Sequence, residues 1–230
     1  MSDWAVLRQV VVATTSHQSD LRAVRAAFGL GEGFADPELK RLNLADATMP
    51  VSAGRYLEFI APIEDTGPVA SWLAKVGPRG GFTLSVQHPD PDGVRARCAE
   101  QGVRVPIDDV AFGRTVLQLH PKDVGLVLEI DGIPERDVWF WDDIDPGPEP
   151  GARVDEILGV EIAVADPAAM AARWTAIMNL PEPVEATTLD LGGPTVRFVP
   201  GGPSADWTIL LRRSGEAVDP ALPGISFRLV

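Results

Sequence analysis

Stretches in which apolar and polar residues alternate recur along the chain and divide it into similar units. Each unit opens on a β-rich strand, at 7–13, 82–87 and 158–164, and continues through a loop, a helix pattern and further strand patterns. A repeat of this size predicts βαβββ units, with the helices on one face of a curved sheet. A fourth opening, at 225–230, is expected to pair with the third unit.

Apolar residues at helical spacing, bounded by capping residues, predict the helices. The first expected helix begins at Ser19 or Asp20 and ends before Gly29, and a short second helix covers 69–76. The third begins at Pro91 or Asp92 and ends near Gly102, and the fourth begins at Asp166 with Pro167 in its first turn. Strand-type runs separated by Gly and Pro predict the remaining strands at 40–44, 55–60, 103–107, 115–119, 126–130, 188–191, 195–199 and 207–211.

The two faces of these strands differ in character, because successive side chains point to opposite sides. In the first opening strand Gln9 shares a face with Val11, and in the second the apolar Phe82 lies opposite Thr83. One face is apolar and fits under the helices. The other mixes single polar groups with Val, Ala and Ile, which is typical of the lining of a concave pocket. Its polar members are Gln9, Tyr56, Glu58, Thr83, Ser85, Gln87, Gln118, His120 and Glu129.

Two carboxylates, Glu58 and Glu129, are expected on this polar face although they are far apart in the sequence. If they converge in a hollow of low dielectric constant, their negative charges repel each other. A bound cation, a shared proton or an intervening water would relieve that repulsion. The cation is the alternative that brings a function with it.

The segment 133–156 interrupts the repeat. It holds eight acidic residues against two arginines, together with Pro146, Pro148 and Pro150, and this composition predicts a solvated linker. Its aromatic run, Trp139-Phe140-Trp141, is the exception. Two interpretations stay open: the rings dock the linker onto the first two units, or they roof a ligand pocket.

Several short motifs of the first two units resemble the vicinal oxygen chelate superfamily, the glyoxalase-like proteins. They are the sequences at 54–62, 102–105, 119–123 and 125–130. The resemblance implies an α+β fold in which two βαβββ modules form a half-open barrel around one metal site. It divides the chain into a two-module domain (1–132), an acidic Pro-rich linker with the aromatic cluster (133–156) and a third βαβββ-like module (157–230).

The same resemblance implies a metal site. By position, the family's ligands fall on Gln9, Glu58, Thr83 and Glu129, and Thr83 stands where the family has a histidine. The implied ligand set is therefore Gln9, Glu58 and Glu129 around a divalent ion of unknown identity, or no ion at all, with His120 as a substitute for the missing imidazole. In the third module Gly159 stands in place of Gln9 and Arg197 in place of Glu58, so that module lacks the ligands.

A metal-assisted lyase or isomerase of a small oxygenated substrate is the function that these residues favour. The cation would stabilise an enolate-type intermediate, and Glu129, with Glu58, would take the catalytic role. The alternative is a non-catalytic, drug-sequestering type of binding protein with a degenerate metal site. Substrate contacts are expected from Tyr56, Thr83, Ser85, Gln87, Gln118, His120, Trp139 and Trp141.

Composition narrows the partners further. The 230 residues carry a formal net charge of −13, and no basic run is present, which disfavours nucleic acids and anionic membranes. The single cysteine, Cys98, excludes an internal disulfide. The beginning of the sequence shows no secretory signal, so a cytoplasmic protein is expected. A homodimer is expected as well, because one unpaired module leaves a sheet edge open.

Overall fold

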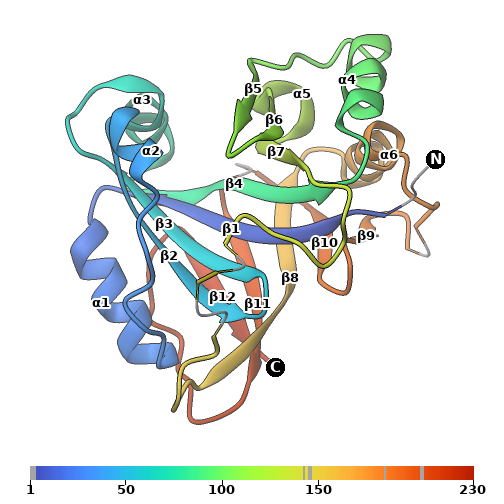
Figure 1. Cartoon of the computed structure of the whole chain (residues 1–230). Coiled ribbons are helices and arrows are strands. Elements are labelled where there is room, and N and C mark those ends of the chain that lie inside the picture. The colour runs from blue at the N-terminus through green and yellow to red at the C-terminus, as the bar shows by residue number, and fades with distance from the viewer. Residues whose placement is uncertain (1–3, 142, 145–146, 184, 203–204) are drawn as a thin grey trace.

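Two β-sheets form the centre of the computed structural model, which describes residues 4–141, 143–144, 147–183, 185–202 and 205–230 (Figure 1). The seven-stranded sheet has the order β2 (Leu44–Ser52), β3 (Arg55–Pro62), β1 (Val6–Thr14), β4 (Arg79–His88), β7 (Val127–Gly132), β6 (Arg114–Leu119) and β5 (Ile107–Ala111). The five-stranded sheet has the order β12 (Ile225–Leu229), β11 (Trp207–Arg213), β8 (Val154–Val164), β10 (Thr195–Pro200) and β9 (Thr188–Asp190).

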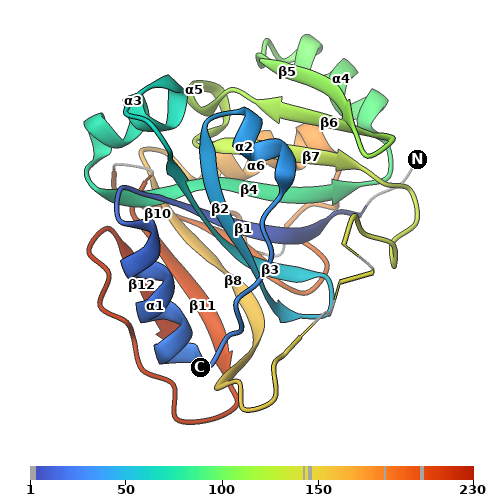
Figure 2. The same ribbon diagram turned by 60° about the vertical axis from the view of Figure 1, so that its left-hand side comes forward.

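Six helices flank the sheets in the described part of the chain. They are α1 (His17–Phe28), α2 (Pro37–Arg41), α3 (Gly67–Val76), α4 (Pro91–Glu100), α5 (Pro121–Val124) and α6 (Pro167–Met178). Helix α1 runs beside β12, where Phe28 and Phe227 are in edge contact with ring centroids 5.0 Å apart, and α4 and α6 lie together at the other end (Figures 1 and 2). Within the described residues, no helix is both long and apolar enough to cross a membrane.

The five-stranded sheet repeats the plan of the larger one. Strands β9-β10-β8-β11-β12 follow each other with the same parallel and antiparallel pairings as β2-β3-β1-β4-β7. The expected pairing of 225–230 with the third unit is therefore confirmed, through β12 beside β11. The repeated βαβββ-like units confirm the predicted α+β fold.

The main core lies where the apolar faces of both sheets meet. Val10 and Leu84 of the first sheet belong to the same buried cluster as Ile162 and Trp207 of the second. This alternation was predicted, and it leaves the polar face of each sheet on the side away from the core.

Two bulges shift the predicted alternation in neighbouring strands. Phe82 was expected on the core side, but the register slips between Val11 and Val12, and Phe82 packs instead against Trp72 on the other face. A second slip between Leu7 and Gln9 leaves Arg8 as an extra residue in β1. A bulge redirects the inserted side chain, and here it brings a guanidinium to the polar side.

Three predicted elements are wrong in detail. The segment expected as a strand at 40–44 contains the end of α2, because Asp36 accepts a hydrogen bond from Glu38 N and Pro37 starts a helical turn. No strand covers 103–107, where β5 begins only at Ile107. Asp20 does not cap α1, which follows Ser16; it is buried and pairs with Arg79 at 2.6 Å.

Candidate functional site

A row of predicted site residues crosses the polar face of the large sheet. Gln9 in β1 pairs in register with Tyr56 in β3 and with Ser85 in β4. Ser85 pairs in turn with Glu129 in β7, and Glu129 pairs with Gln118 in β6. Residues in register on neighbouring strands point to the same side, so these five side chains share one face.

Glu58 lies two residues beyond Tyr56 on that face. Of the two acids predicted there, Glu58 and Glu129, it is the more deeply buried. Its carboxylate is 5% exposed and accepts a hydrogen bond of 2.8 Å from Gln9 Nε2. Burial raises the pKa of Glu58 well above its ordinary value, and the negative charges of Asp46, Glu129 and Asp36 raise this pKa further.

Glu129 is half-buried and held by Gln118, whose Nε2 donates to Oε2 at 2.7 Å. Burial raises the pKa of this carboxyl as well, while the hydrogen bonds from Gln118 and Ser85 lower it in part. Because the charge of Glu129 also acts on the pKa of Glu58, the two acids lie within electrostatic range on one face. The arrangement concentrates negative charge in a sheltered place, as the alternation of the strands suggested.

Two further acids of this region were missed by sequence reasoning. Asp131, also in β7, is buried and accepts a short hydrogen bond from Ser85 Oγ, and burial raises its pKa well above the ordinary value. Asp46 in β2 accepts a hydrogen bond of 2.8 Å from Asp36 N, and burial raises its pKa to about 6. Alternation would have found Asp46 if β2 had been recognised in the sequence.

Two predicted site residues, Gln87 and His120, have structural partners instead. Gln87 is fully buried and binds Arg8 and the backbone oxygens of Ile133 and Glu135, so it anchors the following segment. His120 lies after β6 rather than in it, and its Nδ1 accepts from Lys122 N at the start of α5. The expected position of His120 on the inner face is therefore wrong, because the strand ends at Leu119.

Both interpretations of the aromatic run describe part of it. Trp139 is 4% exposed, packs with Tyr56 and Ile133, and lies under the Arg8 guanidinium, 5.3 Å from the ring centroid, so it docks the segment. Trp141 contacts Phe34 and Phe112 at centroid distances of 5.0 and 5.4 Å. It also lines a hollow, as the second interpretation of the aromatic run expected.

This hollow has a volume of about 300 Å³ and continues the polar face beyond Tyr56. Its described lining consists of Arg8, Ala53, Gly54, Tyr56, Arg136, Asp137, Trp141 and Ile144. It combines guanidinium groups with aromatic rings, which is a common composition for a small-molecule site. Thr83, the remaining predicted contact, is buried on the same face. It lies two residues before Ser85 in β4 and pairs with Val11.

The carboxylate oxygens of Glu58 and Glu129 suit a hard divalent cation, whereas Gln9 turns its Nε2 toward Glu58 and would have to rotate its amide to offer the oxygen. A buried carboxylate whose pKa is raised by neighbouring acids, as that of Glu58 is, is also a group whose charged form a cation would stabilise. Thr83 supplies no imidazole, however, and among the described residues no group of three His, Cys, Asp or Glu side chains is placed to hold a metal ion. A cation here would rest on Glu58, Glu129 and the amide of Gln9.

The equivalent positions of the small sheet carry the opposite charge. Gly159 pairs with Thr195 and Leu210 as Gln9 pairs with Tyr56 and Ser85, which makes Gly159 the counterpart of Gln9. By the same register the counterparts of Glu58 and Glu129 are Arg197 and Arg228. Arg228 forms two hydrogen bonds of 2.8 and 2.9 Å with Glu161, which also lies 3.7 Å from Arg197.

Solved structures of other proteins share the fold of this chain. No protein-family model matches the chain, and no curated protein matches its sequence. Among solved structures, a methylmalonyl-CoA epimerase in complex with methylmalonyl-CoA and NH4+ is 22% identical, over 56% of this chain and 95% of its own, with a TM-score of 0.50. A variant of the Streptomyces coelicolor methylmalonyl-CoA epimerase in complex with 2-nitronate-propionyl-CoA is 23% identical, over 58% of this chain and all of its own, also at 0.50. These neighbours are glyoxalase-fold proteins of the vicinal oxygen chelate superfamily, and this chain shares their fold.

Proposed function

We propose that the chain is a glyoxalase-fold isomerase or lyase that moves a proton on a small oxygenated substrate with the help of a divalent cation. The observation that carries the proposal is the buried Glu58, held by Gln9 and within electrostatic range of Glu129 on one sheet face. Burying a carboxylate beside other acids costs stability, and such an arrangement is typical of sites that serve chemistry.

Glu58, Glu129 and the amide oxygen of Gln9 are the groups that would hold the cation. When bound, a divalent ion supplies a Lewis acid that stabilises negative charge on a substrate oxygen. Glu129 would leave the cation to take up the proton from the carbon next to the carbonyl group, and would then return it. Asp46 is a second candidate for this step, since its pKa of about 6 lies close to the pH at which a proton is both accepted and released.

The structural neighbours support an isomerase as the first class to test. One of them is a methylmalonyl-CoA epimerase bound to methylmalonyl-CoA, whose acidic proton lies between two carbonyl groups. Substrates of this kind, with a proton made acidic by a neighbouring carbonyl oxygen, match the oxygen-rich polar face described above. Methylmalonyl-CoA and related α-branched thioesters are therefore the first substrates to examine.

Metal content and proton exchange test the proposal together. The purified chain, loaded with Mg²⁺, Mn²⁺ or Co²⁺ and then desalted, should retain metal in elemental analysis. Glu58→Gln and Glu129→Gln should lose it, and Glu161→Gln on the small sheet should keep it. In D₂O the parent chain should replace the α-proton of a thioester by deuterium, observed by NMR, and both site variants should slow this exchange at least about 100-fold.

The proposal is overturned if the parent chain retains no metal and exchanges no α-proton on any thioester of the panel. It is equally overturned if both variants keep the metal and the exchange rate of the parent chain. The Glu161→Gln control shows whether an effect belongs to the site or to the loss of any partly buried acid.

A binding protein without catalysis is the second candidate, and Thr83 is the observation that favours it. This residue replaces the imidazole that the resemblance implies at that position and leaves the cation with one ligand fewer. Trp139 and Trp141 lie beside the hollow, so ligand binding should change the tryptophan fluorescence without any turnover. Saturable fluorescence changes in a chain that shows no metal and no proton exchange would favour this candidate.

A further inference from the structure

The hollow between β1, β3 and the aromatic segment takes no part in the proton chemistry described above. We propose that it is a subsite for the anionic end of a small organic acid, with a flat apolar body packed on Tyr56 and Trp141. This inference rests on the proposed function in one respect, namely that the ligand held in the hollow also reaches Glu58. The charge, the aromatic walls, the position and the size of the hollow support it.

The charge of the hollow starts with Arg8, the residue inserted by the bulge in β1. Its guanidinium is held by Gln87 Oε1, by the oxygen of Gly54 at 3.2 Å and by the oxygen of Arg136 at 2.7 Å, and it lies over the Trp139 ring. Because these bonds hold the guanidinium in place, Arg8 acts on an anion in the hollow through its positive charge. The residue is 8% exposed, so an anion beside it would be partly shielded from water.

Arg136 is the second arginine of the lining, and its guanidinium lies over the Trp4 ring, 5.6 Å from the ring centroid. Among the described lining residues, the two arginines are opposed by one acid, Asp137. This composition contrasts with a chain whose formal net charge is −13 and with the acids that surround Glu58 on the same sheet. An organic anion is therefore attracted to this end of the face and repelled from the other, which orients it.

The aromatic walls supply the apolar surface. Trp141 is fixed by contacts with Phe34 and Phe112, so it forms a rigid wall of the hollow. Tyr56 provides a second ring, and two rings held in place give a flat ligand apolar surface on which to pack.

Position connects the hollow with the reactive face. Tyr56 precedes Glu58 by two residues in β3, a distance of about 7 Å along a strand, and it is in register with Gln9. A ligand with its anionic group at Arg136 and its body on Tyr56 therefore points its other end toward Glu58. The volume of about 300 Å³ is at the lower limit for a ligand pocket, which selects a small acid.

Direct binding of a probe acid tests the inference independently of turnover. The probes are benzoate and its neutral analogue benzyl alcohol, measured by calorimetry on the full chain treated with chelator. Benzoate should bind saturably at millimolar concentration, and benzyl alcohol at least about tenfold more weakly. Arg136→Met should weaken benzoate about tenfold, and Trp141→Ala, which removes one aromatic wall, about threefold to tenfold.

Arg212→Met is the matched control, because Arg212 is an exposed arginine of the small sheet paired with Asp155. Its affinity for benzoate should stay within about twofold of the parent value. The inference is overturned if benzoate does not bind, if benzyl alcohol binds equally well, if either pocket variant keeps the parent affinity, or if Arg212→Met weakens binding as much as Arg136→Met.

The result separates this inference from the proposed function. Benzoate binding should not weaken in Glu58→Gln, since that change removes an acid outside the hollow. If metal binding and proton exchange fail while benzoate binds as expected, the proposed function falls and the anion subsite stands. If metal and exchange are found but benzoate is not bound, the subsite alone falls.

Discussion

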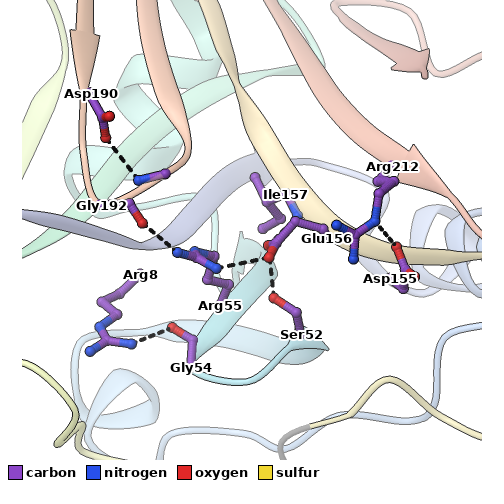
Figure 3. A network of polar contacts seen from close by, with 11 residues as sticks. Arg8, Ser52, Gly54, Arg55, Asp155, Glu156, Ile157, Asp190, Gly192 and Arg212 are labelled. Atoms are coloured by element: carbon purple, nitrogen blue, oxygen red, sulfur yellow. Dashed lines mark hydrogen bonds and ion pairs between the residues drawn. The ribbon is translucent and has the colours of Figure 1, made fainter.

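Arg55 and Glu156 join the two sheets through an ion pair of 2.9 Å between Nη1 and Oε2 (Figure 3). Both side chains are 19% exposed. The other oxygen of Glu156 accepts hydrogen bonds of 2.8 Å from Ser52 Oγ and from the backbone N of Ile157, and Arg55 Nη2 donates to the oxygen of Gly192 at 2.7 Å. One carboxylate thus links the β2–β3 hairpin of the large sheet to the start of β8.

Glu156→Ala should destabilise the chain by about 2–4 kcal/mol, because it leaves a largely buried guanidinium and a hydroxyl without their acceptor. Its neighbour Asp155 gives the matched control, since its partner Arg212 is 53% exposed. Asp155→Ala should cost less than about 1 kcal/mol. Urea unfolding of both variants measures the difference, and equal losses would contradict a special role for the pair between the sheets.

Gly81→Ala should destabilise the chain by about 3 kcal/mol or more through steric overlap alone. A Cβ atom at Gly81 would overlap the indole ring of Trp207, which packs from the small sheet onto β4. Gly202 has no atom within 4 Å of the corresponding position, and Gly202→Ala should change the free energy of unfolding by less than about 0.5 kcal/mol. Thermal melting separates the two outcomes, and a Gly81→Ala chain that melts with the parent would disprove the close contact.

Asp46 should make the chain less stable as the pH rises. The folded state keeps the Asp46 proton to a pH of about 6, whereas the unfolded state releases it near 3.8, so the free energy of unfolding falls between these values and levels off above them. Asp46→Asn should remove this part of the fall, on the order of 1 kcal/mol after allowance for solvent screening. Urea midpoints across this range, with the exposed Glu100→Gln as control, measure the slope; an unchanged slope in Asp46→Asn contradicts the assignment.

Glu58→Gln should stabilise the metal-free chain at pH values above neutrality. The neutral amide removes a buried charge that faces Glu129 and Asp46, and the expected gain is about 1 kcal/mol or more. Glu161→Gln, which loses the paired hydrogen bonds of Arg228, should not be stabilising. Melting temperatures in chelator compare the two, and a lower melting temperature for Glu58→Gln would show that this carboxylate is compensated in the folded chain.

The sequence predicted most of the fold because the periodicity of its strands is strong. The face on which Gln9 and Glu58 lie follows from alternation alone, and Asp166 with Pro167 begins α6 as expected, with Asp166 accepting from Ala169 N at 3.0 Å. Phe82 shows the limit of this reasoning. A single bulge reverses the face of a residue, and a bulge is decided by contacts between strands rather than by the strand's own sequence.

The sequence predicted only those site residues whose positions follow from local strand patterns. Glu129 and Gln118 are in register because their strands follow each other through a short connection. His88 follows the strand pattern predicted at 82–87, but it is fully buried and binds the oxygen of Met178 at 2.8 Å, a partner 90 positions away. Arg8 and Arg136 were likewise missed as neighbours, since only the folded chain brings together a bulge in β1 and a residue after β7.

The matching order of strands in the two sheets gives the molecule an internal reference. The two predicted acids of the candidate site have basic counterparts at the same topological places, Arg197 for Glu58 and Arg228 for Glu129. Any response to pH or added ions that arises from general surface charge will therefore affect both halves of one molecule, whereas a response specific to the acidic half will not be mirrored in the other. Spectroscopic probes placed on equivalent strands of the two sheets would report the response of each sheet from a single sample.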